Sequence, residues 1–122
     1  MAEVGAIMAW TFIEETPVPA EIDNMLIAGE HAVCAYKTIR DVAVITNKRF
    51  IIADKQGITG KKVEIYTIPF KSINMYSSEN AGKFLDFNSE LELWTRAGRF
   101  KLNLKKGIDI RALDKVIAEH IL

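Results

Sequence analysis

The chain has 122 residues, which is enough for one well-packed core and too few for two ordinary domains. Hydrophobic residues make up 49% of the sequence and charged residues 26%, a balance typical of a soluble globular protein. Sixteen basic residues offset sixteen acidic ones, so no global positive field would draw the protein to nucleic acid or to an anionic membrane. We predict an N-terminal arm at residues 1–16 and one domain at residues 17–122.

The N-terminal arm contains a mostly apolar run at residues 4–13, about half the ~20 residues that a transmembrane helix needs. No basic residue precedes this run, which argues against a secretory signal. We expect Trp10, Phe12 and Ile13 to pack on the domain or on a neighbouring subunit. An arm that touches a membrane or docks a partner is the alternative, and it lacks cationic flanks.

Residues 17–29 predict a short helix, because Pro19 suits a first helical turn and Gly29 suits a stop. After Gly29 the apolar residues recur at every second position, which is the spacing of β-strands. Pro69 should limit the fourth strand, because proline cannot donate to a β-ladder. The predicted strands lie at residues 32–38, 42–46, 49–54, 63–68, 73–78, 90–96 and 99–105.

Residues 107–122 predict a C-terminal amphipathic helix, with Asp109 as its N-cap and Leu113 and Ile117 on its apolar stripe. Such a helix can close the open end of a small barrel. The predicted fold is therefore mainly β with α: a seven-stranded antiparallel barrel or two packed sheets, with a short N-terminal helix and a C-terminal helix as cap.

The strands at residues 42–46 and 49–54 are apolar on both faces if residues 47–48 form their turn. A barrel wall needs one apolar face, so the second must be covered by a helix, by the arm or by another subunit. We expect this second face to contribute to a homo-oligomer interface. Its candidate residues are Val42, Val44 and Ile51.

The last two strands are expected to turn at residues 97–98. In that register Leu93 faces Leu102, and the strand pair has one apolar and one polar face. The same register sets Arg96 opposite Arg99, at the exposed end of the hairpin.

The single cysteine, Cys34, lies in the apolar run of residues 32–36. One cysteine forms no intrachain disulfide, which suits a reducing compartment, and we predict a cytoplasmic protein. Cys34 is expected to be a small buried hydrophobic residue rather than a reactive thiol.

The turns and strand ends from residue 29 onwards carry a family resemblance. Residues 46–50 (TNKRF), 54–64 (DKQGITGKKVE), 68–73 (IPFKSI) and 90–94 (ELELW) resemble the bacterial pleckstrin-homology (PH) domain family. The resemblance implies a PH-like fold of seven strands and a C-terminal helix. It also implies a small stand-alone protein without catalysis that assembles into rings or larger homo-oligomers.

Motifs for catalysis or metal binding are weak. Residues 57–62 (GITGKK) lack the glycine spacing and the following helix of a phosphate loop. His31 and His120 stand apart, without Cys or acidic residues at metal-ligand spacing. Asp41 and Asp54 should face each other among basic neighbours, as a charge-balanced strand end rather than an acid–base pair. No catalytic, cofactor-binding or metal-binding residue is predicted.

Four basic residues form a candidate anion or lipid patch if the fold brings them together, and Lys71 extends the set. They are Lys48, Arg49, Lys61 and Lys62. Solvated strand ends explain the same residues without a ligand.

The leading functional hypothesis is a non-enzymatic homo-oligomer that acts as a scaffold or binding module. Its expected partners are copies of itself and a protein or peptide, which can add a strand to an exposed sheet edge. The alternative is a peripheral membrane protein that recognises anionic lipid. The balanced charge argues against nucleic acid.

Overall fold

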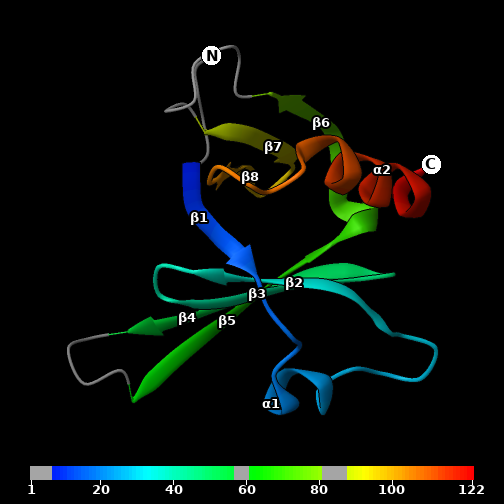
Figure 1. The fold of residues 1–122 in the computed structure, drawn as a ribbon. Helices are drawn as coiled ribbons and strands as arrows, with labels where there is room; N and C mark the ends of the chain where they lie inside the picture. Colours follow the sequence, from blue (N-terminus) through cyan, green and yellow to red (C-terminus); the bar gives the residue numbers. More distant parts are fainter. Residues whose placement is uncertain (1–6, 57–60, 81–87) are drawn as a thin grey trace.

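The computed structural model describes residues 7–56, 61–80 and 88–122 (Figure 1). Within these residues eight strands form one sheet, in the order β5-β4-β3-β2-β1-β8-β7-β6. The elements are β1 (Ile7–Glu15), α1 (Ala20–Asp23), β2 (Ala32–Thr38), β3 (Asp41–Thr46), β4 (Arg49–Gln56), β5 (Lys62–Pro69), the 3₁₀ turn η1 (Phe70–Ser72), β6 (Ile73–Glu79), β7 (Ser89–Thr95), β8 (Gly98–Leu104) and α2 (Ile110–Ile121). All seven predicted strands and both predicted helices are present.

The eighth strand is β1, which the sequence placed in an arm outside the domain. It pairs antiparallel with β2 and parallel with β8, so the sheet is not wholly antiparallel. In Figure 1, β1 runs between the half made by β2–β5 and the half made by β6–β8 and α2. The two packed sheets of the prediction are thereby joined into one curled sheet. Residues 1–6 of the predicted arm lie outside the described residues.

Buried and more exposed side chains alternate along β1, as expected for a strand. Trp10 and Phe12 point into the core, whereas Ile13 on the other face is 38% exposed. This is a period of two, the period of a strand. Because residues 4–13 are almost continuously apolar, the period is hard to see in the sequence.

The sheet curls around one main core, to which all eight described strands, η1 and α2 contribute. The core residues are Trp10, Phe12, Tyr36, Ala43, Ile45, Phe50, Ile52, Ile68, Phe70, Ile73, Leu91, Leu93, Leu102, Leu104, Ile110, Leu113 and Ile117. Asp109 caps α2 as predicted, since its side chain accepts hydrogen bonds from the backbone N–H of Arg111 at 3.0 Å and of Ala112 at 3.1 Å.

A second, smaller core lies on the opposite face of β3 and β4, beneath α1. Its buried residues are Ile22, Ala35, Val42, Val44, Ile51 and Ala53. The helix α1 has four residues and is shorter than the predicted segment 17–29, because the chain turns after Asn24 and Gly29 takes a φ of +80°. This face does need a cover, as the sequence indicated.

The residues of the predicted oligomer interface lie in this second core. Val42, Val44 and Ile51 are buried within one chain, under Ile22 and its neighbours. They therefore present almost no surface to a second subunit.

Of the two predicted registers, that of β3 and β4 is confirmed, with Ile45 opposite Phe50. The register of β7 and β8 is wrong by two residues: Thr95 faces Gly98, and Trp94 faces Arg99. The Thr95 hydroxyl accepts from the backbone N–H of Ala97 at 3.1 Å and donates to the Gly98 carbonyl at 3.0 Å, which fixes the tighter turn. A shift of two keeps the same side chains inward.

We expect Phe12→Ala to lower the free energy of unfolding by about 3–5 kcal/mol, because a fully buried ring leaves a cavity between β1 and both halves of the sheet. The matched control is Ile13→Ala on the exposed face of the same strand, which should cost about 1 kcal/mol or less. Urea unfolding followed by circular dichroism measures both. Equal losses would contradict a core position for β1.

Candidate functional site

The four basic residues of the predicted patch lie at two different ends of the β4–β5 hairpin. Arg49 pairs with Pro69 at one end, and Gln56 pairs with Lys62 at the other. Arg49 and Gln56 are seven positions apart along β4, a distance of roughly 23 Å. Lys48 therefore lies with Arg49, Lys61 with Lys62, and the fold does not form the predicted four-residue patch.

At the first end, Arg49 forms a buried ion pair with Glu30. Arg49 Nε donates to Glu30 Oε2 at 2.8 Å and Nη2 donates to Oε1 at 3.0 Å, while the Glu30 side chain is 0% exposed. Thr46 Oγ1 also donates to Oε2 at 2.7 Å, and the backbone N–H of Ile27 donates to Oε1 at 3.1 Å. The pair thus holds the segment before β2 against the β3–β4 turn.

These contacts hold the pKa of Glu30 well below its usual range. The hydrogen bond from Arg49 lowers the pKa of Glu30 from 4.5 to about 2, although burial acts in the opposite direction; Thr46 and the Ile27 amide lower the pKa further. The carboxylate is ionised at neutral pH. The guanidinium of Arg49 neutralises this negative charge, so the ion pair adds no net charge to its surroundings.

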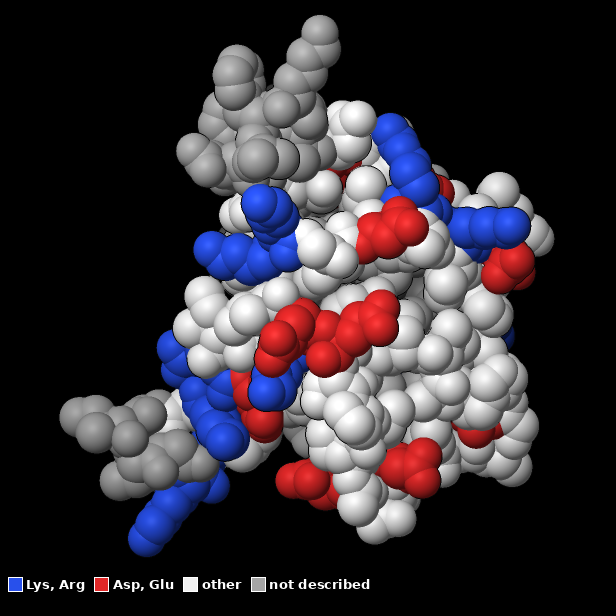
Figure 2. All heavy atoms as spheres, in the orientation of Figure 1, with Lys and Arg blue, Asp and Glu red and all other residues white. Residues whose placement is uncertain are grey.

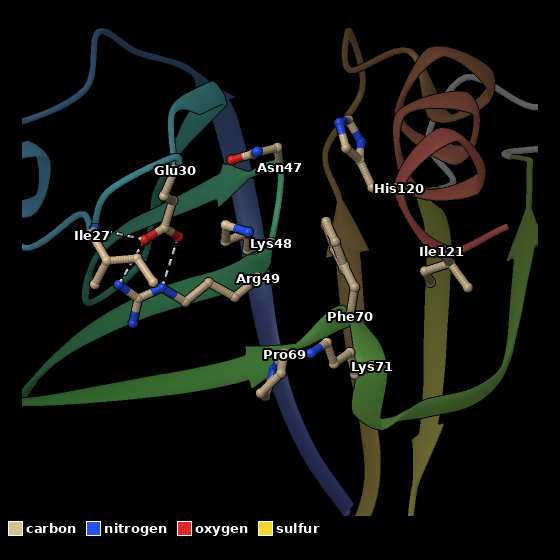
Figure 3. Close-up of a pocket in the computed structure, with 10 residues that line it drawn as sticks. All are labelled: Ile27, Glu30, Asn47, Lys48, Arg49, Pro69, Phe70, Lys71, His120 and Ile121. Carbon is tan, nitrogen blue, oxygen red and sulfur yellow. Dashed lines mark hydrogen bonds and ion pairs between the residues drawn. The ribbon is translucent and has the colours of Figure 1, made fainter.

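Beside this ion pair lies a cavity of about 540 Å³, which we call the Phe70 cavity (Figure 3). Figure 3 shows its walls coming from the segment before β2, the β3–β4 turn, the corner between β5 and η1, and the last turn of α2. Its lining residues are Ile27, Glu30, Asn47, Lys48, Arg49, Pro69, Phe70, Lys71, His120 and Ile121.

Phe70 holds the walls of this cavity in place. Its ring makes an edge contact with Phe50, with the ring centroids 5.4 Å apart. It stacks on His120 with a centroid distance of 5.8 Å and an interplanar angle of 25°. Its backbone N–H donates to the Lys48 carbonyl at 3.0 Å. The His120 Nδ1 lies 2.7 Å from the Val116 carbonyl, which fixes the imidazole. Lys48 and Lys71 are thereby carried by segments bonded to each other.

The second end of the hairpin gathers charges of both signs. Arg40 Nη2 donates to the Lys55 carbonyl at 2.6 Å, and the same guanidinium contacts the Asp54 carboxylate. Asp41 faces Asp54, as the sequence predicted. Figure 2 shows basic side chains around this end with acidic side chains beside them. Ile39, in the β2–β3 turn, is 72% exposed among these charges.

The sheet also has two free edges among the described residues, β5 and β6. β5 pairs with β4 along all eight of its residues without a register shift, whereas β6 has an irregularity between Ile73 and Met75. Val63 and Ile65 on β5 are 45% and 41% exposed. They border a groove of about 270 Å³ that reaches Ile22 beneath α1.

Four further features considered in the sequence are metal-ligand clusters, Cys34, the glycine-containing connection and membrane-spanning helices. Across the described residues, no group of three or more His, Cys, Asp or Glu side chains could hold a metal ion. Burial raises the pKa of the Cys34 thiol, which packs against the main core although it is only partly buried. Residues 57–60 of the glycine-containing connection lie outside the described residues. In the parts of the chain that are described, no helix is long and apolar enough to cross a membrane.

The sequence assigned three residues of the Phe70 cavity to an anion site: Lys48, Arg49 and Lys71. Phe70 and His120 were missed as site residues, because they meet only when α2 packs on η1. Glu30 was missed because its partner is nineteen positions away in the chain.

A curled sheet capped by a C-terminal helix is the architecture of a PH-like domain, and comparison with known proteins gives its family. Residues 3–121 match the sequence profile of the bacterial PH domain. The chain belongs to the bacterial PH-domain family.

Its relatives include the uncharacterized protein YjqA of Bacillus subtilis (strain 168), which is 43% identical over 104 residues, covering 83% of this chain and 82% of that protein. The structure is similar to that of a DUF1696 family protein with a pleckstrin-homology domain from Shewanella loihica PV-4, with a TM-score of 0.80, 38% identity and coverage of 89% of this chain and 97% of that one. A pleckstrin homology domain from Shewanella amazonensis SB2B gives a TM-score of 0.66 and 42% identity, covering 84% of each chain.

We expect stability to fall as the pH drops from about 4.5 towards about 2, because the folded state keeps Glu30 ionised below the pH at which the unfolded chain binds a proton. The lowered pKa of Glu30 contributes about 3 kcal/mol to the free energy of unfolding above pH 4.5. Glu30→Gln should lose that stability at neutral pH and show a flatter pH dependence in this window. Urea unfolding at several pH values measures both.

The matched control is Glu14→Gln, which removes the exposed ion pair with Lys37 at 3.3 Å and should cost less than about 1 kcal/mol. If the Glu30→Gln variant kept the pH dependence of the unmodified protein, another carboxylate would carry the acid sensitivity.

Proposed function

We propose that this bacterial PH domain is a non-enzymatic, cytoplasmic binding module that works as a homo-oligomer, with β5 as a contact strand between subunits. The observation that carries the proposal is the exposed edge of β5. This strand is bonded to β4 on one side, and no strand covers its other side within the described residues. Free backbone groups along such an edge are a template for pairing with another chain.

The side chains of β5 favour this edge over the edge at β6. Val63 and Ile65 are exposed beside the groove under α1, where a second copy would bury them. The β6 edge is interrupted near Met75, and irregular edges pair poorly with other strands. A contact between unlike surfaces of identical subunits closes into a ring if its rotation allows. That geometry supports a scaffold of several subunits.

The support for binding rather than catalysis comes from the cavity and its charges. The Phe70 cavity presents lysines and aromatic rings, and the carboxylate in its wall is held by Arg49. These are features of a recognition site.

We expect the unmodified protein to sediment as a species larger than its 13.7 kDa monomer. The double variant Val63→Lys/Ile65→Lys should sediment as a monomer. A subunit contact would have to remove water from two lysine ammonium groups on the edge strand, which costs free energy, and the two like charges also repel each other. Both side chains are exposed, so the fold should persist in circular dichroism.

The matched control is Met75→Lys, which places a charge at an exposed apolar position on the other edge strand and should leave the assembly intact. A monomer at every concentration of the unmodified protein would refute assembly. Dissociation by the control alone would move the contact to β6.

Anionic lipid is the second candidate partner, and the observation that favours it is Ile39. This apolar side chain is 72% exposed in the β2–β3 turn and lines a hollow together with the exposed Lys55. The exposed Lys62 lies at the same end of the β4–β5 pair. An apolar tip among cations suits the surface of an anionic bilayer. The acidic side chains at the same end, Asp41 and Glu64, weaken that attraction.

If lipid is a partner, the protein should float with phosphatidylglycerol vesicles at low salt and should separate from them at high salt. Ile39→Ser and Lys62→Glu should each reduce the floating fraction, with a loss of roughly fivefold in affinity for the charge change. Lys106→Glu, at an exposed lysine before α2, is the control. Salt-independent flotation, or none, would exclude this end as a lipid site.

A further inference from the structure

We propose that the Phe70 cavity binds a small anion that carries a flat apolar group, of the chemical class of an aromatic phosphate monoester. The site lies at the end of the hairpin opposite to Ile39 and does not use Val63 or Ile65 of the β5 edge. It therefore goes beyond the assembly and the lipid contact proposed above. Its recognition elements are two lysines and a pair of stacked rings.

The charge of the cavity selects an anion. Lys48 and Lys71 line it from two different segments and are exposed, and neither forms an ion pair with another described residue. Glu30 does not cancel them, because its carboxylate is fully engaged by Arg49, Thr46 and a backbone N–H. Charge-assisted hydrogen bonds from ammonium groups to phosphate are short and strong. The cavity thus offers two unused cations and no unused carboxylate among its described lining residues.

The floor and the rim of the cavity select an apolar group. Phe70 and His120 are already stacked, so a third ring can extend the stack across the imidazole face. Ile27 is 61% exposed at the mouth, although it is a large apolar side chain, and Pro69 and Ile121 add further apolar surface. A ligand that covers Ile27 gains the free energy of removing that surface from water.

The cavity is built before the ligand arrives. Phe70 is held by Phe50 and His120, and its backbone N–H ties η1 to the Lys48 carbonyl. Little backbone ordering is left to oppose binding, which favours affinity. The volume of about 540 Å³ lies within the range of roughly 300–1,000 Å³ that small-molecule sites occupy.

The Lys48 and Lys71 side chains are positioned to meet the anion while the ring enters between them and His120. Figure 3 shows Lys48 on the side of the β3–β4 turn and His120 on the side of α2, with Phe70 between the two walls. The phosphate would lie at the outer end, because Lys48 and Lys71 are both exposed to water. The ring would lie against Phe70 and His120.

The test uses 1-naphthyl phosphate as probe, with calorimetry for affinity and nuclear magnetic resonance for location. We expect saturable binding that shifts the ring resonances of Phe70 and His120. 1-Naphthol lacks the anion and inorganic phosphate lacks the ring, so each should bind at least about tenfold more weakly. Equal binding of 1-naphthol would overturn the role of the lysines, and equal binding of inorganic phosphate would overturn the role of the rings.

Variants at the exposed lysines test the site without disturbing the core. Lys48→Gln and Lys71→Gln should each weaken 1-naphthyl phosphate binding roughly tenfold, since each removes one charge-assisted hydrogen bond. Lys106→Gln is the matched control, because Lys106 is an exposed lysine outside the cavity, and it should leave the affinity unchanged. Unchanged affinity in both cavity variants, with or without shifts at His120, would overturn the proposal.

A phosphate headgroup of a lipid and a free phosphate ester share this chemistry, and one further arm separates them. Vesicles that contain phosphatidic acid are added to the complex with 1-naphthyl phosphate. Displacement of the probe from the unmodified protein assigns the lipid headgroup as ligand if direct vesicle binding is also lost in Lys48→Gln/Lys71→Gln and kept in Lys62→Glu. Retention of the probe assigns a soluble ligand. Displacement that depends on Lys62 but not on Lys48 or Lys71 would overturn the cavity as the shared site.

Discussion

The fold depends on β1 as the strand that joins two smaller sheets. Within the described residues, β2–β5 form one paired set and β6–β8 another, and β1 bonds to both β2 and β8. Its aromatic side chains also contact both sets of strands in the core. Phe12 stacks on Tyr36 of β2, and the rings of Trp10 and Phe100 of β8 have centroids 6.0 Å apart. The Phe70 cavity is framed by the same two halves, with the β3–β4 turn on one side and α2 on the other. The geometry of the candidate site therefore rests on a strand that takes no part in it.

The cover of the second apolar face does not extend over β5. Ile22 of α1 packs over β3 and β4, but the cover ends before β5, so Val63 and Ile65 remain exposed. A four-residue helix has too little surface to extend further. The sequence correctly indicated that the hairpin at residues 42–54 needs a cover. It could not decide between a helix and another subunit, because both supply the same apolar contact.

Several features followed from the sequence because they depend on local patterns. The period of two and the flanking turns placed seven strands, and the stripe through Leu113 and Ile117 placed α2. Features that depend on tertiary structure did not follow. The turn at residues 96–97 is set by hydrogen bonds of the Thr95 hydroxyl with the backbone of Ala97 and Gly98, which the apolar pattern does not indicate. The length of β4 separates the predicted basic residues into two pairs. His120 lines the same cavity as Lys48 because α2 packs on Phe70.

Arg49 links the candidate cavity to the edge strand. Its guanidinium holds Glu30 in the cavity wall, and Nη1 donates at 3.3 Å to the hydroxyl of Thr67 on β5. Side chains that share a hydrogen-bonding partner are energetically coupled, so a change at Arg49 would alter the cavity wall and the edge together. Among the described residues, the side chains of Lys48, in the β3–β4 turn, and Lys71, in η1, form no such pair of hydrogen bonds to the cavity wall and to β5. Substitutions at the lysines and on the outer part of β5 therefore test the proposed ligand binding and the proposed assembly separately, whereas a substitution at Arg49 does not.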